Sequence, residues 1–136
     1  SLMEPTLFDT SVWVNYLRGT ISPQTDLLAE YIFNDYEVLL CPTVVQEVLQ
    51  GITDDGQYAK VKNSILGFGC LVWSPVEAAV YAAELYRNMR TKGVTVRRSN
   101  DCLIASFALK FDVALCHEDS DFNLIATKTD LKVWKP

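Results

Sequence analysis

Four short apolar runs alternate along the chain with longer segments in which apolar residues recur at helical spacing. The runs at 7–8, 37–41, 69–73 and 113–116 are typical of buried strands. The intervening segments predict helices over 12–17, 23–34, 44–50, 57–66, 75–91 and 100–111. Because strands alternate with helices, we predict an α/β fold, a three-layer sandwich with a mainly parallel central sheet.

Hydroxyl residues stand where several of these helices are expected to begin. Thr10 or Ser11 is the expected cap of the first helix, and Thr43, Ser74 and Ser99 are the expected caps of later ones. After the last long helix, the pattern predicts a strand, a polar turn over 117–121, a helical turn over 122–127 and an edge strand over 131–134.

Length and composition indicate one globular domain. The chain has 136 residues, of which 49% are hydrophobic and 21% charged, as in an ordinary water-soluble protein. Ser1 and Leu2 precede Met3 like residues left by cloning, so we expect the domain to span 3–136. No apolar run approaches the length of a membrane span, and no signal-peptide pattern is visible, so we expect a cytoplasmic protein without a membrane partner.

The number and spacing of the cysteines also favour a cytoplasmic location. Cys41, Cys70, Cys102 and Cys116 are scattered, without a C-x-x-C pair, and His117 is the only histidine. Buried thiols in a reducing cytoplasm explain this usage better than disulfides or a zinc site.

The net charge of −5 argues against a protein that coats nucleic acid by charge alone. It leaves room for a local basic patch, and five basic residues fall close together: Arg87, Arg90, Lys92, Arg97 and Arg98. They are candidates for gripping the phosphates of RNA. A solvated helix end followed by a loop explains them equally well.

Acidic residues occupy the critical ends of the predicted elements. Asp9 follows the first strand, Glu47 lies one turn into the helix after the second, and Asp101 is in the first turn of the helix at 100–111; Asp119 and Asp121 follow the strand at 113–116. Each alone has a structural explanation as a turn, cap or solvated residue. In a parallel sheet, however, all five would converge on one crevice, where they would repel one another unless a hard cation such as Mg²⁺ or Mn²⁺ bound them.

With its acids in this order and spacing, the sequence resembles the PIN-domain family, specifically the VapC-type toxins of bacterial and archaeal toxin–antitoxin pairs. The resemblance covers nearly the whole chain. The motifs that carry it are Asp9-Thr10-Ser11-Val12-Trp13-Val14 with Tyr16-Leu17-Arg18-Gly19, Pro42-x-x-x-x-Glu47, Asn100-Asp101-x-x-Ile104-Ala105 and Asp119-x-Asp121-Phe122.

The resemblance implies a Mg²⁺- or Mn²⁺-dependent endoribonuclease that is inhibited by an antitoxin protein. The family's catalytic and metal-binding quartet falls on Asp9, Glu47, Asp101 and Asp119, and Asp121 would be an accessory metal ligand. The expected supporting residues are Thr10, Ser11 and Asn100. Asn15 stands where many relatives carry an acid.

Three alternatives stay open on the sequence. A catalytically silent PIN scaffold would bind RNA or protein only. A phosphatase of the haloacid-dehalogenase type would need a second aspartate where Ser11 stands, and a phospho-accepting receiver domain would need a late lysine after a strand.

The expected assembly is a homodimer. VapC relatives usually form two-fold dimers, and the chain has more large aromatic residues than a small core always hides: Trp13, Phe33, Trp73, Tyr81 and Tyr86. The candidate contact helices are those at 23–34 and 75–89. The alternative is that the aromatic residues belong to the core.

Overall fold

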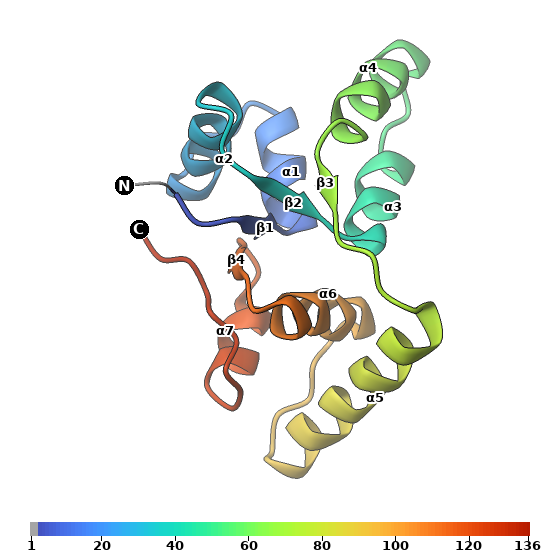
Figure 1. Ribbon diagram of the computed structural model, residues 1–136, viewed down its shortest axis with the longest axis vertical. Coiled ribbons are helices and arrows are strands. Elements are labelled where there is room, and N and C mark those ends of the chain that lie inside the picture. Colours follow the sequence, from blue (N-terminus) through green and yellow to red (C-terminus); the bar gives the residue numbers. More distant parts are fainter. Residues whose placement is uncertain (1–2) are drawn as a thin grey trace.

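Four parallel strands form the central sheet in the spatial order β3-β2-β1-β4 (Figure 1). The computed structural model describes residues 3–136, so the proposed leftover residues Ser1 and Leu2 lie outside the described part of the chain. The strands are β1 (Thr6–Phe8), β2 (Val38–Leu40), β3 (Gly69–Cys70) and β4 (Ala114–Cys116). The all-parallel pairing confirms the expected α/β fold.

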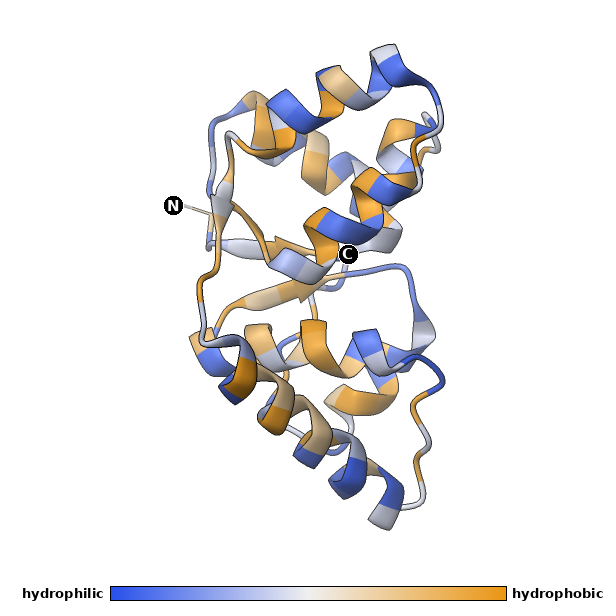
Figure 2. Ribbon diagram, turned by 90° about the vertical axis from the view of Figure 1, so that its right-hand side faces the viewer, coloured by the Kyte–Doolittle hydropathy of each residue, from blue (hydrophilic) through white to orange (hydrophobic). Residues whose placement is uncertain are grey.

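Helices cover both faces of this sheet, as Figures 1 and 2 show. On one side lie α1 (Thr10–Leu17), α2 (Pro23–Phe33), α3 (Pro42–Gln50) and α4 (Asp55–Ile65). On the other side lie α5 (Pro75–Thr91), α6 (Ser99–Phe111) and α7 (Ser120–Ala126). The three layers therefore correspond to the predicted sandwich.

Strands β1, β2 and β4 are largely apolar and buried, and Figure 2 shows the sheet between the two helical layers. The two residues of β3 are exposed, so the expected buried strand over 69–73 is reduced to a short exposed one. Leu7, Phe8 and Leu115 are fully buried, and all three residues of β2 are buried. A parallel strand covered by helices on both faces has no polar side, which explains why the apolar runs are continuous rather than alternating.

The predicted capping residue is wrong for three helices. Asp9 caps α1 by accepting a hydrogen bond from the Ser11 backbone, so neither Thr10 nor Ser11 is the cap. Cys41 precedes α3 and Arg98 precedes α6, each without a side-chain capping bond. In each case the last extended residue takes the cap position, which moves the expected hydroxyl residue into the helix. Ser74 is the cap of α5, as predicted.

The end of the chain also departs from expectation. The predicted strand at 131–134 reduces to one parallel bridge, between Leu115 and Val133. The predicted helical turn at 122–127 is α7, which begins earlier because Asp119 caps it. The polar turn after β4 is therefore short, and it lies directly at the carboxyl end of that strand.

The cysteines have free thiols, as expected from their spacing. Burial raises the pKa of Cys41 and Cys116 to about 12, so both stay protonated at neutral pH. Protonated thiols are poor metal ligands. Within residues 3–136, no helix is both long and apolar enough to span a bilayer.

Candidate metal centre

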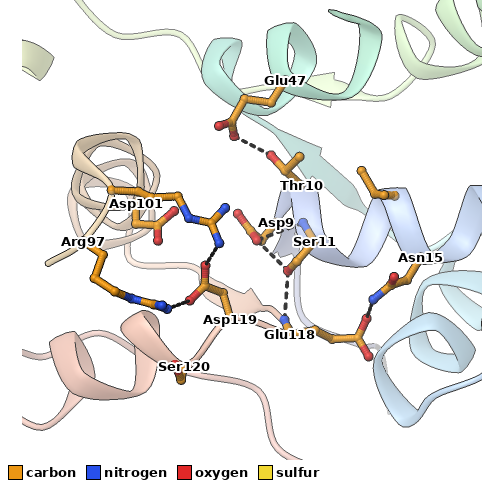
Figure 3. Close-up of a pocket in the computed structure, with 12 residues that line it drawn as sticks. Asp9, Thr10, Ser11, Asn15, Glu47, Arg97, Asp101, Glu118, Asp119 and Ser120 are labelled. Carbon is orange, nitrogen blue, oxygen red and sulfur yellow. Dashed lines mark hydrogen bonds and ion pairs between the residues drawn. The ribbon is translucent and has the colours of Figure 1, made fainter. Parts of the chain in front are cut away.

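A cavity of about 420 Å³ opens at the carboxyl end of β1, between α1, α3, α6 and the turn after β4 (Figure 3). The carboxyl ends of parallel strands share one edge of the sheet, which is where α/β proteins usually bind ligands. The cavity is lined by Asp9, Thr10, Ser11, Val14, Asn15, Glu47, Arg97, Arg98, Asp101, Glu118, Asp119 and Ser120. All four acids of the expected quartet are thus brought to one place.

Asp9 is held by the helix that it caps. Its Oδ2 accepts hydrogen bonds from the Ser11 backbone N–H at 3.0 Å and from the Ser11 hydroxyl at 2.6 Å. Its Oδ1 is buried and has no hydrogen-bond partner. Burial raises the pKa of Asp9, the bonds from Ser11 oppose that rise, and the charge of Glu47 adds to it.

Glu47 is on the same side of the cavity and is held by neutral donors. The Thr10 hydroxyl donates to Oε1 at 2.7 Å, and the Asn100 amide donates to Oε2 at 3.3 Å. Thr10 comes from α1 and Asn100 from α6, so these two bonds connect α3 with both neighbouring helices. The three expected supporting residues, Thr10, Ser11 and Asn100, therefore each hydrogen-bond to one of the acids.

Three acids form a tight cluster opposite. Asp101, Asp119 and Asp121 each offer a carboxylate oxygen, and these oxygens lie within 4.8 Å of one another. The Oδ2 atom of Asp101 is buried without a hydrogen-bond partner. Burial raises the pKa of Asp101 to about 7; the charges of Asp119 and Asp9 add to this rise, and Arg98 opposes it.

Two arginines pair with this cluster. Arg98 Nη2 lies 3.3 Å from Asp119 Oδ2, and Arg97 Nη2 lies 3.8 Å from Asp119 Oδ1. Arg97 also donates to Asp121 from its backbone N–H and from Nε, each at 3.3 Å. Asp121 is thereby turned toward Arg97 and is not among the residues that line the cavity. Both arginine side chains remain about two-thirds exposed, at 66% and 67%.

The other three basic residues of the expected RNA-binding set lie elsewhere. Arg87 lines a separate cavity between α5 and α6, and the Arg90 guanidinium carbon lies 5.7 Å from the centre of the Tyr86 ring. Lys92 donates to the backbone carbonyl of Lys128 at 3.3 Å. Only Arg97 and Arg98 of the five line the acidic cavity.

One acid of the cavity, Glu118, is not among the residues predicted from the sequence. Its carboxylate accepts a hydrogen bond from the Asn15 amide, and its backbone N–H donates to the Ser11 hydroxyl at 2.9 Å. Asn15 is the position at which the family resemblance calls for an acid, and Glu118 brings one beside it. The signal in the sequence is the acidic turn that follows β4, in which Glu118 directly precedes Asp119.

The arrangement fits a hard divalent cation. Among the described residues, the buried side-chain atoms without a hydrogen-bond partner are Asp9 Oδ1, Asp101 Oδ2 and Trp13 Nε1, and the first two belong to residues of this cavity. A carboxylate oxygen left unpaired in a buried position is costly unless a cation binds it. Oxygen ligands from several carboxylates are the set that Mg²⁺ and Mn²⁺ prefer. Asp101, Asp119 and Asp121 offer oxygens close enough together to bind one ion, and Asp9 and Glu47 line the same cavity.

The chain is similar in sequence to known proteins over most of its length. A family model described as PIN domain matches residues 6–128. Ribonuclease VapC11 of Mycobacterium tuberculosis is 33% identical over 127 residues, which cover 93% of this chain and 95% of that protein.

Solved structures show the same fold. DNA-bound VapBC from Salmonella typhimurium matches with a TM-score of 0.75 at 14% identity, covering 97% of this chain and 98% of that one. VapBC2 from Rickettsia felis, bound to a promoter DNA fragment, matches with a TM-score of 0.74 at 18% identity, covering 96% and 98%.

Proposed function

Since this chain belongs to the PIN-domain family, we propose that it is a divalent-metal-dependent endoribonuclease, the toxin of a VapBC-type toxin–antitoxin pair. The observation that carries the proposal is the pair of buried, partnerless carboxylate oxygens, one on Asp9 and one on Asp101, at a single acidic cavity. The relatives at 33% identity are named ribonucleases, which supports RNA as the substrate. The haloacid-dehalogenase and receiver alternatives have no comparable support.

The proposed cofactor is Mg²⁺ or Mn²⁺, held by Asp9, Asp101 and Asp119, with Glu47 and Asp121 as further carboxylates. A bound divalent cation supplies Lewis-acid chemistry: it activates water as a nucleophile and stabilises the charge that develops on the phosphate. Ser11 fixes the orientation of Asp9 by holding Oδ2 with two hydrogen bonds, which leaves Oδ1 free to ligate. Thr10 and Asn100 orient Glu47 by donating one hydrogen bond to each of its two carboxylate oxygens.

Arg97 and Arg98 have a different role in this mechanism. Their guanidinium groups neutralise Asp119 and Asp121 in the metal-free protein, and both side chains are largely exposed. RNA phosphate can therefore reach the same guanidinium groups from solvent and be held next to the acids. Arg87, Arg90 and Lys92 do not line the acidic cavity, so their part in RNA binding stays a prediction.

The proposed protein partner is a cognate antitoxin, because VapBC structures share this fold over nearly the whole length of the matched chains. A cavity rich in carboxylates would also attract a basic segment of such a partner. The cytoplasmic location expected from the sequence stays a prediction.

A homodimer is the proposed assembly, and α5 is the better-supported contact helix. Val76 and Val80 are one turn apart on α5 and are 73% and 53% exposed; Val72, just before the helix, is 85% exposed. An exposed apolar stripe of this kind is typical of an interface. Phe33, at the end of α2, is 89% exposed, so α2 stays the second candidate contact helix. Trp13, in contrast, is buried in the core.

A cleavage assay tests the proposed activity. The chain is incubated with mixed RNA in Mg²⁺ or Mn²⁺, and in parallel with EDTA. We expect internal cleavage with either ion and none with EDTA. The Asp101→Asn variant controls for a contaminating nuclease, because it should lose the activity while remaining folded. RNA binding without cleavage under any ion would instead support the silent-scaffold alternative.

A further inference from the structure

A second cavity, of about 780 Å³, lies directly behind the acidic one. The segment from Glu118 to Ser120 forms a wall of both cavities, so they are separated only by the turn that carries Asp119. The remaining walls come from the start of α2, from α7 and from the C-terminal tail. A group bound in this second cavity would therefore be a neighbour of whatever occupies the first.

The tail that closes this cavity is fixed in position. The Leu115 backbone N–H donates to the Lys132 carbonyl at 2.9 Å, and the Trp134 N–H donates to the Leu115 carbonyl at 2.9 Å. Because the tail pairs in parallel with β4, it lies beside the outermost strand of the sheet, whose carboxyl end leads into the turn that carries Asp119. Trp134 is held there, half-buried, as the aromatic wall of the cavity.

The opposite wall has a hydrogen-bonding group whose polarity is fixed. The Asp119 backbone N–H donates to His117 Nδ1 at 3.0 Å, which makes Nδ1 an acceptor and leaves the proton of a neutral imidazole on Nε2. Nε2 lies 3.2 Å from Asn123 Oδ1, so it donates to that oxygen. The amide of Asn123 is thereby oriented with its NH₂ group available as a donor at an exposed position of the cavity.

We propose that this second cavity binds an unpaired nucleobase of the RNA, next to the phosphate cleaved at the acidic site, with the base stacked on Trp134 and a base carbonyl accepting from Asn123. Aromatic stacking with hydrogen bonds to the base edge is the usual way in which proteins bind single-stranded RNA. The exposed Lys135 ammonium, also at this cavity, adds a cation for the neighbouring phosphate. The proposal rests on the proposed ribonuclease function, and it predicts a preference for bases that carry a carbonyl oxygen over adenine, which has none.

The stacking half is tested by RNA binding in EDTA, where the substrate stays intact. Fluorescently labelled hexauridylate is titrated against wild type, Trp134→Ala and Trp134→Phe, and affinity is read from anisotropy. We expect Trp134→Ala to bind about 10-fold more weakly and Trp134→Phe to recover most of that loss, because phenylalanine keeps an aromatic face. Trp73→Phe is the matched control, since Trp73 packs against Phe107 away from this cavity. Equal affinity in wild type and Trp134→Ala would overturn the stacking contact.

The hydrogen-bonding half is tested by Asn123→Asp. The new carboxylate still accepts from His117 but has no NH₂ group to offer a base. We expect the ratio of hexauridylate to hexaadenylate affinity to fall in this variant. Leu124→Asp adds the same charge one residue along α7, outside the cavity walls. It should lower the affinities for hexauridylate and hexaadenylate by the same factor. An unchanged ratio in Asn123→Asp would overturn the assigned contact.

These outcomes are distinguishable from failure of the ribonuclease proposal, because the binding measurements need no cleavage. A wild type that cleaves mixed RNA in Mg²⁺, together with variants that bind like wild type, refutes only the base site. A wild type that shows the Trp134 and Asn123 effects but never cleaves refutes only the enzyme.

Discussion

The two sides of the acidic cavity hold their carboxylates by opposite means. On one side, Asp9 and Glu47 accept hydrogen bonds from neutral hydroxyl, amide and backbone donors. On the other side, Asp119 and Asp121 face the guanidinium groups of Arg97 and Arg98. Neutral donors orient a carboxylate and leave its charge intact, whereas an arginine both orients it and cancels the charge.

Under the proposed function, this difference would give the two sides separate roles. The side with Asp9 and Glu47 would bind the cation, which is consistent with the unpaired Oδ1 of Asp9. On the other side, Arg97 and Arg98 pair with Asp119 and Asp121 without a metal, and they would be able to exchange a carboxylate for an RNA phosphate. Asp101 belongs to the same cluster as Asp119 and Asp121, but its Oδ2 is buried without a donor, and burial raises its pKa, as burial also raises the pKa of Asp9.

The largest effect is expected for Asp101→Asn. Loss of one carboxylate from the metal site should lower RNA cleavage by about 100-fold or more, since groups that stabilise charge in the transition state have effects of that size. The metal-free protein should become more stable, because a repelling buried charge is removed. Cleavage rate and thermal unfolding in EDTA measure the two effects. Asp130→Asn, an exposed position, is the control, and wild-type cleavage by Asp101→Asn would contradict the assignment.

The arginine side is tested by Arg97→Ala combined with Arg98→Ala. If these residues hold phosphates, the slope of log affinity against log salt should fall by roughly 1 to 1.5, the value for two contacts to a single strand. Binding titrations in EDTA at several salt concentrations measure the slope. Lys60→Ala with Lys62→Ala removes the same charge from α4, away from the cavity, and should leave the slope nearly unchanged. Identical slopes for both double variants would mean that Arg97 and Arg98 only balance the acids.

The pH dependence of stability tests whether the pKa of Asp101 is raised in the folded protein. Its pKa in the folded protein is raised from 3.8 to about 7, so the folded state binds a proton more tightly than the unfolded state. The resulting stability is complete at low pH and is lost as the pH rises through 7. We expect the metal-free protein to lose roughly 1 kcal/mol of unfolding free energy from this residue between about pH 6 and pH 8.

Urea unfolding in EDTA at the two pH values measures this loss. Asp101→Asn should show a much smaller change over the same interval, and added Mg²⁺ should oppose the loss in wild type, because a cation binds the ionised carboxylate. An equal pH response in Asp101→Asn and wild type would show that another group is responsible.

The smallest effect is expected on the neutral side. Thr10→Val removes the hydroxyl that donates to Glu47 and keeps the shape of the side chain. We expect Mn²⁺ affinity, measured by calorimetry, to fall by about 10-fold or less, as for other residues that orient a metal ligand. Thr91→Val, which removes a hydroxyl bonded to the Asn88 carbonyl near the far end of α5, is the matched control. If Thr10→Val lowers Mn²⁺ affinity as much as Asp101→Asn does in the same calorimetric measurement, Glu47 is a primary ligand of the ion.

The sequence alone determined the order of elements and most of the acids at the cavity. The continuous apolar run at 38–41 is short for a helix and indicates a strand buried on both faces, and parallel strands bring their carboxyl ends to one edge. Asp9, Glu47, Asp101 and Asp119 could therefore be placed together from local pattern and a topological rule. Glu118 lies in the same acidic turn as Asp119, but the local pattern does not show that its carboxylate lies beside Asn15.

Tertiary structure decided everything that depends on contacts between distant segments. The pairing of Arg97 and Arg98 with Asp119, and of Asn15 with Glu118, joins residues of different elements whose separation along the chain carries no signal. The same holds for the second cavity, which Trp134 lines together with Asn123 and His117 because the tail pairs with β4. Local sequence fixes the elements because propensity and burial act over a few residues, while the partners of each charge depend on how the elements pack.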